Sequence, residues 1–167
     1  QLGRYVDVSD HPTEAADPLA RFVAQMNQTA QDLGLRETIY RNTHGMTDPD
    51  HLTSVRDLAH LAAHAMRIPR FRELVGTPRR GCTVESTAGY RRNVLWKNTN
   101  RLLGIEGYQG VKTGTTNAAG ACLVSYGSRD DRSLIVVVLG SSSSDARYTD
   151  TRNLFRWGWQ RLSSSEN

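Results

Sequence analysis

Residues 107–120 have the sequence Gly-Tyr-Gln-Gly-Val-Lys-Thr-Gly-Thr-Thr-Asn-Ala-Ala-Gly. This stretch is the most informative part of the sequence for predicting the fold. Its first half predicts a strand over 108–114, and a tight connection leads into a second predicted strand over 119–127. At its centre lies the tripeptide Lys112-Thr113-Gly114. Lys97 is the chain's other lysine among 21 Lys and Arg residues, so a lysine at this place is informative.

Before this stretch, helical periodicity gives way to short β-like runs. Asp17-Pro18 predicts the start of a helix that ends at Gly34. Ser54-Val55-Arg56-Asp57 predicts a capping box for a second helix, which Pro69 stops before a short turn over 71–75. Residues 82–86 and 91–96, around Ala88-Gly89, then predict a β-hairpin.

After it, the pattern predicts one more strand and a closing helix. A polar turn over 128–132 separates the strand at 119–127 from one at 133–140, whose Val136-Val137-Val138 is typical of a central, buried strand. Serines 141–144 with Asp145 predict the start of a last helix. We therefore expect a single α+β domain over 1–167: helices over 1–76, an antiparallel sheet over 77–140, and a terminal helix over 141–162. The earlier helices and the terminal helix should lie on opposite faces of the sheet.

Composition limits the classes of protein. Hydrophobic residues make up 38% of the 167 residues and charged residues 23%, as in soluble globular proteins. No apolar run approaches the ~20 residues that span a bilayer. The net charge of +4 arises from scattered cations matched by 17 acids, which indicates a mixed solvated surface rather than a nucleic-acid partner.

The residue types in the tripeptide suit one wall of an acyl-transfer site. Lys112 would place an ammonium beside a substrate carboxylate, which the Thr113 or Thr115 hydroxyl could also bind. Gly114 would leave the strand edge bare for a peptide to pair with it as an added strand. The backbone N–H that follows the glycine could serve as an oxyanion donor. In isolation, however, the tripeptide favours a threonine-glycine turn carrying an exposed lysine over an active-site strand.

Further stretches accompany the tripeptide along nearly the whole chain: Phe22-Val23 with Met26-Asn27, 42–46, 51–59, 96–100, 107–120, and Arg147 with Trp157-Gly158. In this order they resemble the serine-type D-Ala-D-Ala carboxypeptidases of peptidase family S11, the low-molecular-weight penicillin-binding proteins. The resemblance implies part of the serine β-lactamase and penicillin-binding-protein transpeptidase-like fold. It also implies that 42–45 and 54–57 are structural, as a turn and a helix start.

The resemblance further implies a function. Lys112 would be the substrate-binding lysine, Thr113 and Thr115 would line the carboxylate site with Gly114 between them, and the Thr115 N–H would join the oxyanion hole. The enzyme would remove the terminal D-alanine of peptidoglycan stem peptides through an acyl-enzyme, without a metal or organic cofactor. β-Lactams would acylate the same serine. This substrate places the enzyme in the cell envelope, on the periplasmic or extracytoplasmic side.

Two signatures of that family are missing from the chain. No serine is followed three residues later by a lysine, and no Ser-x-Asn precedes the Lys112-Thr113-Gly114 tripeptide. Ser9-Asp10-His11 is a near match that we interpret as a loop, and residues 1–6 as the end of the helix that follows the second signature. The chain is then expected to be the C-terminal portion of a longer enzyme, with no catalytic residue of its own and the N-terminal portion as its partner.

Other interpretations of the missing signatures stay open. The chain could be a non-catalytic homologue that binds peptidoglycan, a degenerate homologue, or one part of a site that a separate polypeptide completes. The coding sequence upstream of Gln1 distinguishes these cases, since a Ser-x-x-Lys there would establish the enzyme.

The histidines and cysteines raise the possibilities of a zinc site and of a disulfide, and the sequence favours neither. His60 and His64 lie at i, i+4 like zinc-protease ligands, but Leu61 stands where the general base would be, so packing or surface roles are favoured. Cys82 and Cys122 lack metal-ligand spacing, and we interpret them as two small buried hydrophobes rather than a disulfide.

Overall fold

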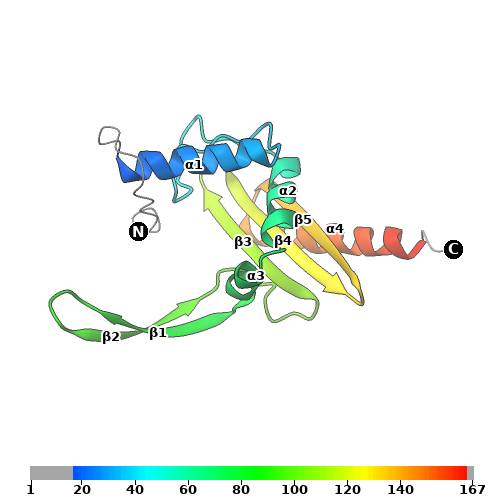
Figure 1. Cartoon of the computed structure of the whole chain (residues 1–167). Helices are drawn as coiled ribbons and strands as arrows, with labels where there is room; N and C mark the ends of the chain where they lie inside the picture. Colours follow the sequence, from blue (N-terminus) through cyan, green and yellow to red (C-terminus); the bar gives the residue numbers. More distant parts are fainter. Residues whose placement is uncertain (1–16, 165–167) are drawn as a thin grey trace.

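A computed structural model describes residues 17–164 and shows an α+β arrangement (Figure 1). The predictions for Ser9-Asp10-His11 and for residues 1–6 lie outside these residues. The elements are α1 (Pro18–Asp32), α2 (Val55–Ala65), α3 (Pro69–Gly76), β1 (Arg79–Glu85), β2 (Arg91–Lys97), β3 (Tyr108–Thr116), β4 (Gly120–Arg129), β5 (Arg132–Ser141) and α4 (Ser144–Ser164).

The main sheet has the order β3-β4-β5 and is antiparallel throughout. Both connections are short: β3 turns into β4 through 117–119, and β4 into β5 through Asp130-Asp131. The prediction of a central strand at Val136–Val138 is wrong for the described residues, because β4 is the central strand and β5 lies at an edge. Val136 and Val138 are buried because they pack against Phe155 of α4.

The core lies between this sheet and α4. Phe155 is 1% exposed, and its ring meets that of Tyr108 edge-on with 5.1 Å between centroids. Gly127 allows this close approach, since a Cβ there would lie 2.8 Å from the Phe155 ring. A second cluster joins Leu102, Leu123 and Tyr148 further along the same helix. The side-chain sizes at β4 and α4 therefore set how closely the helix packs.

The helices that precede the sheet do not all cover its other face. Figure 1 shows α2 in front of β4 and β5 and α4 behind them, as expected. The α1 helix instead lies beyond the ends of the strands. It is tied to the following loop by Asn27, whose amide donates to the Tyr40 carbonyl at 2.8 Å and accepts from the Tyr40 N–H at 2.7 Å.

The helix starts follow the sequence with two differences. Asp17 accepts from the Leu19 N–H at 3.1 Å, so the predicted cap of α1 is confirmed. Ser54 caps α2 by accepting from the Asp57 N–H, but the Asp57 carboxylate turns away to the preceding loop, so only half of a capping box forms. The predicted turn after Pro69 is wrong: residues 69–76 form α3, because proline is well suited to the first position of a helix.

The Asp57 carboxylate ties α2 to the loop before it, and its removal should be costly. It is 4% exposed and accepts from the Glu37 N–H and the Thr38 hydroxyl, each at 2.8 Å. We expect Asp57→Ala to lower the free energy of unfolding by about 2–3 kcal/mol, because the buried Thr38 hydroxyl and the partly buried Glu37 N–H lose a charged acceptor. Urea unfolding measures this. Asp50→Ala, which removes an exposed carboxylate, is the control and should cost below about 0.5 kcal/mol; equal losses would contradict the assignment.

Strands β1 and β2 form a separate hairpin that projects away from the main sheet (Figure 1). The prediction of a hairpin around Ala88-Gly89 is confirmed: the Ser86 N–H donates to the Tyr90 carbonyl at 2.9 Å, and Gly89 has φ of +83°. Both strands run further toward the body of the protein than predicted, to Arg79 and Lys97.

The two cysteines are free thiols, and neither is a buried hydrophobe as interpreted from the sequence. Cys82 is exposed on the hairpin, where its sulfur accepts from the Trp96 indole N–H at 3.1 Å. Cys122 is half-buried on β4. Two-stranded hairpins have no second layer to bury their faces, which explains the exposure of Cys82.

Candidate active-site strand

Strand β3 places Lys112, Gly114 and Thr115 along an open edge. One edge of β3 pairs with β4, with Thr113 opposite Leu123 and Gly114 opposite Cys122. The other edge has no strand beside it within residues 17–164. All three residues are exposed, and no atom lies within 4 Å of the position that a Gly114 Cβ would take. An unpaired edge with a bare glycine can accept an extended chain by main-chain hydrogen bonds.

The two threonines of this strand have different environments. Side chains alternate along a strand, so Lys112 points to one side of β3, and Thr113 and Thr115 to the other. Thr113 is 7% exposed, and its hydroxyl lies 2.6 Å from that of Thr99. Thr115 is exposed, with its hydroxyl within reach of a ligand. The structure therefore brings Lys112, Gly114 and Thr115 to the surface together and places the Thr113 hydroxyl inside.

Arg147, in the first turn of α4, holds β3 in place by hydrogen bonds. It is 6% exposed, and its Nη1 donates to the Gly114 carbonyl at 3.0 Å, the Thr115 hydroxyl at 2.9 Å and the Cys122 carbonyl at 3.2 Å. Its Nη2 donates to the Ser144 hydroxyl at 3.0 Å, while its buried Nε has no partner among the described residues. A guanidinium so held fixes β3 against β4 and brings a positive charge under Thr115.

The two ends of β3 are held by side chains from the preceding loops. At its start, the buried Asn100 amide donates to the Gly110 carbonyl at 2.9 Å. At its end, the Thr47 hydroxyl donates to the Thr116 hydroxyl at 2.8 Å. Thr47 directly follows the turn at 42–46, in which the Asn42 side-chain oxygen, Oδ1, accepts from the Gly45 N–H at 2.8 Å. Preceding parts of the chain thus hold the two ends of the strand.

The model of the D-alanyl-D-alanine carboxypeptidase family, Peptidase_S11, matches residues 14–143, which include the whole of β3. The chain belongs to this family.

Curated relatives support the same assignment. The D-alanyl-D-alanine carboxypeptidase of Streptomyces sp. (strain K15) is 34% identical over 149 residues, which are 88% of this chain and 51% of that protein. The D-alanyl-D-alanine carboxypeptidase DacD of Escherichia coli (strain K12) is 32% identical over 146 residues, or 86% of this chain and 36% of that protein. The chain therefore spans about half the length of the Streptomyces relative and less of the other.

Solved structures of family members confirm the expected fold. The Streptomyces K15 DD-transpeptidase superposes with a TM-score of 0.84 at 32% identity, over 92% of this chain and 60% of that one. Penicillin-binding protein D2 from Listeria monocytogenes, in its cefotaxime-bound form, gives 0.69 at 29% identity, over 84% and 56%. The chain thus has the fold of penicillin-binding family members over the part that it shares with them.

Sequence reasoning did not single out Arg147 as a site residue, although the resemblance included it. Its partners Gly114 and Thr115 lie more than 30 residues earlier in the chain, so only tertiary structure brings them together. The histidines of the zinc alternative, His60 and His64, are exposed on α2. Among residues 17–164, no three His, Cys, Asp or Glu side chains are placed to hold a metal ion.

Proposed function

We propose that this chain supplies one wall of the active site of a serine-type D-Ala-D-Ala carboxypeptidase that removes the terminal D-alanine from peptidoglycan stem peptides. The observation that carries the proposal is the open edge of β3, where Lys112, Gly114 and Thr115 are exposed side by side. A stem peptide would pair with this edge as an added strand, and its terminal carboxylate would meet the Lys112 ammonium.

The Thr115 hydroxyl is proposed to bind the same carboxylate at the open edge of β3, from the side of the strand opposite to Lys112. Arg147 Nη1 donates to Thr115 Oγ1, so this oxygen acts as an acceptor toward the protein and its proton is free to point outward. The outward proton can then be donated to a substrate carboxylate, while Arg147 adds positive charge behind it. Thr113 contributes to the site through its main chain, because its hydroxyl faces Thr99. The Thr115 N–H is assigned as an oxyanion donor.

The covalent chemistry is assigned to groups outside this chain, since no Ser-x-x-Lys occurs in it. In that chemistry a serine oxygen attacks the carbonyl carbon of the penultimate residue, and the bond to the last D-alanine breaks as its nitrogen takes a proton. Water then hydrolyses the resulting ester and regenerates the serine. The residues on β3 bind and orient the peptide and stabilise the developing oxyanion. The enzyme acts in the cell envelope, where its substrate lies, and β-lactams inhibit it by acylating the serine.

A substitution of Thr115 tests its role in carboxylate binding. In the enzyme that contains this chain, Thr115→Val should raise KM for a stem pentapeptide by about tenfold to a hundredfold, because a hydrogen bond to a charged group is lost. Thr115→Ser restores the hydroxyl and should stay within about threefold of the parent. The measurement is D-alanine release against peptide concentration. If valine and serine at position 115 gave the same KM, the hydroxyl would have no such role.

The missing nucleophile favours a second candidate, a non-catalytic protein that uses the β3 edge to bind stem peptides. The two candidates differ in one measurement. A carboxypeptidase that contains this chain forms a covalent adduct with a labelled penicillin, whereas a binding protein retains peptidoglycan without forming one.

Among the helices of residues 17–164, none combines the length and apolar character needed to cross a bilayer.

A further inference from the structure

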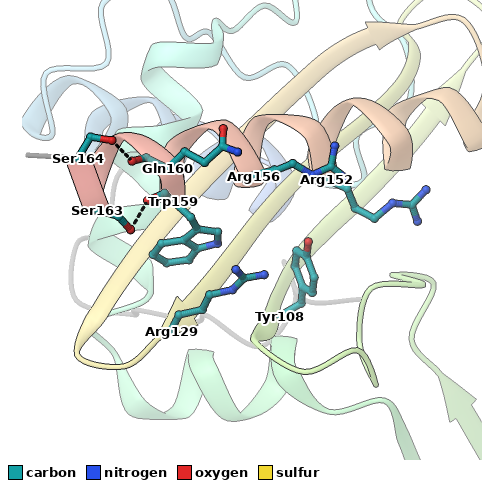
Figure 2. A pocket seen from close by; sticks show the side chains of 8 residues that line it. All are labelled: Tyr108, Arg129, Arg152, Arg156, Trp159, Gln160, Ser163 and Ser164. Atoms are coloured by element: carbon teal, nitrogen blue, oxygen red, sulfur yellow. Dashed lines mark hydrogen bonds between the residues drawn. The ribbon is translucent and has the colours of Figure 1, made fainter.

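A depression of about 590 Å³ lies beneath the C-terminal half of α4, at the opposite end of the sheet from Thr115 (Figure 2). Tyr108 begins β3 and Arg129 ends β4, so the depression is about 20 Å along the strand from the Thr115 site. Its volume lies within the range of small-molecule sites. Its lining comprises Tyr108, Arg129, Arg152, Arg156, Trp159, Gln160, Ser163 and Ser164.

The charged groups of this lining are all positive. Arg129 comes from β4 and lies below the Trp159 ring in Figure 2, with 5.5 Å between its guanidinium carbon and the ring centroid. Arg152 and Arg156 follow one another by one turn of α4. Within the part of the chain that the structure describes, none of these three arginines forms an ion pair with a carboxylate. Asp130 and Asp131, which follow Arg129 in sequence, line a neighbouring depression that shares Arg129, Trp159 and Ser163 with this one. Asp150, two residues before Arg152, is not among the residues of the lining.

The uncharged groups add hydrogen-bond donors and two aromatic surfaces. The Tyr108 hydroxyl and the Gln160 amide both line the depression, and each can donate to a ligand. The Ser163 and Ser164 hydroxyls already donate to helix carbonyls, at 3.0 and 2.9 Å. Tyr108 and Trp159 present ring surfaces beside the arginines. Such a lining favours a ligand that is strongly anionic at one end and has an organic body at the other.

We propose that this depression binds a phosphate-bearing ligand at a site separate from the β3 edge. Planar guanidinium groups make paired hydrogen bonds to phosphate oxygens, and a phosphate monoester carries up to two negative charges that three arginines can match. The ligand is either a small phosphate compound or a phosphodiester polymer of the cell envelope, since both present phosphate oxygens to the guanidinium groups, the polymer with one negative charge on each phosphate. The proposal does not depend on catalysis at β3.

The charge distribution supplies a control for non-specific attraction of anions. The β1–β2 hairpin contains five of the chain's 21 cations and one of its 17 acids, which leaves sixteen of each elsewhere. The whole net charge of +4 therefore lies on the hairpin. A polyanion attracted by charge alone would bind there, and Arg92→Gln would weaken that binding by removing an exposed hairpin cation.

Calorimetric titration of the chain with inorganic pyrophosphate and with poly(glycerol phosphate) tests the proposal. The double variant Arg152→Gln/Arg156→Gln should weaken binding by about tenfold or more, while Arg92→Gln should change it by less than about twofold. Both arginines are exposed, so circular dichroism should show an unchanged fold. Pyrophosphate binding alone identifies a small phosphate compound, and polymer binding alone identifies a phosphodiester polymer. No binding of either probe, or equal weakening in the helix and hairpin variants, would overturn the proposal.

Discussion

Phe155→Ala is expected to lower the free energy of unfolding by about 3–5 kcal/mol. Phe155 is 1% exposed and packs against Val136 and Val138 of β5 and the Tyr108 ring of β3. Truncation leaves a cavity between α4 and the sheet that Gly127, which has no side chain, cannot fill. Urea unfolding followed by far-UV circular dichroism measures the loss.

The neighbouring residue provides a matched control. Leu154 lies on the same turn of α4 but is 43% exposed, so Leu154→Ala changes the helix in a similar way without opening a core cavity. We expect it to cost about 1 kcal/mol or less. Similar losses in the two variants would show that the contact between α4 and the sheet is not the centre of the core.

Lys112→Ala is expected to slow acylation by a penicillin about a hundredfold in the enzyme that contains this chain. A penicillin carries a carboxylate where the stem peptide does, and the Lys112 ammonium is proposed to bind it. The side chain is exposed and donates to the carbonyl of the adjacent Thr113, so the unfolding free energy should change by less than about 0.5 kcal/mol. The rate of incorporation of a labelled penicillin measures the effect.

The chain's other lysine is the control for this variant. Lys97 ends β2 on the hairpin and is exposed, so Lys97→Ala removes the same charge away from the β3 edge. Its acylation rate should stay within about twofold of the parent. If Lys97→Ala and Lys112→Ala slowed the reaction alike, the loss would reflect net charge rather than a site on β3.

Much of the fold was predictable because local chemistry determines it. Asp17-Pro18 and Ser54 mark helix starts through hydrogen bonds made within one turn, and both starts occur where predicted. The Ala88-Gly89 hairpin follows from turn chemistry in the same way. The prediction of a turn after Pro69 is wrong because proline both ends one helix and suits the first position of the next.

The features that sequence could not predict depend on distant partners. An apolar run such as Val136–Val138 indicates burial but not what covers it, and here a helix covers an edge strand. The Thr113 hydroxyl is withdrawn from the open edge by Thr99, fourteen residues earlier. Nothing in the sequence around Arg147 distinguishes it from other helix arginines. The fold places its guanidinium within hydrogen-bond distance of the Thr115 hydroxyl. Each of these outcomes is decided by packing between elements rather than by propensity within one.

The measurement that tests the central proposal most directly is the release of free D-alanine from a stem pentapeptide that ends in D-Ala-D-Ala. It is made with the enzyme that contains this chain, as the parent and as the Lys112→Ala and Lys97→Ala variants. We expect release by the parent and by Lys97→Ala, and its loss in Lys112→Ala. No release by the parent, or full release by Lys112→Ala, would contradict the proposal that β3 forms the substrate-binding wall.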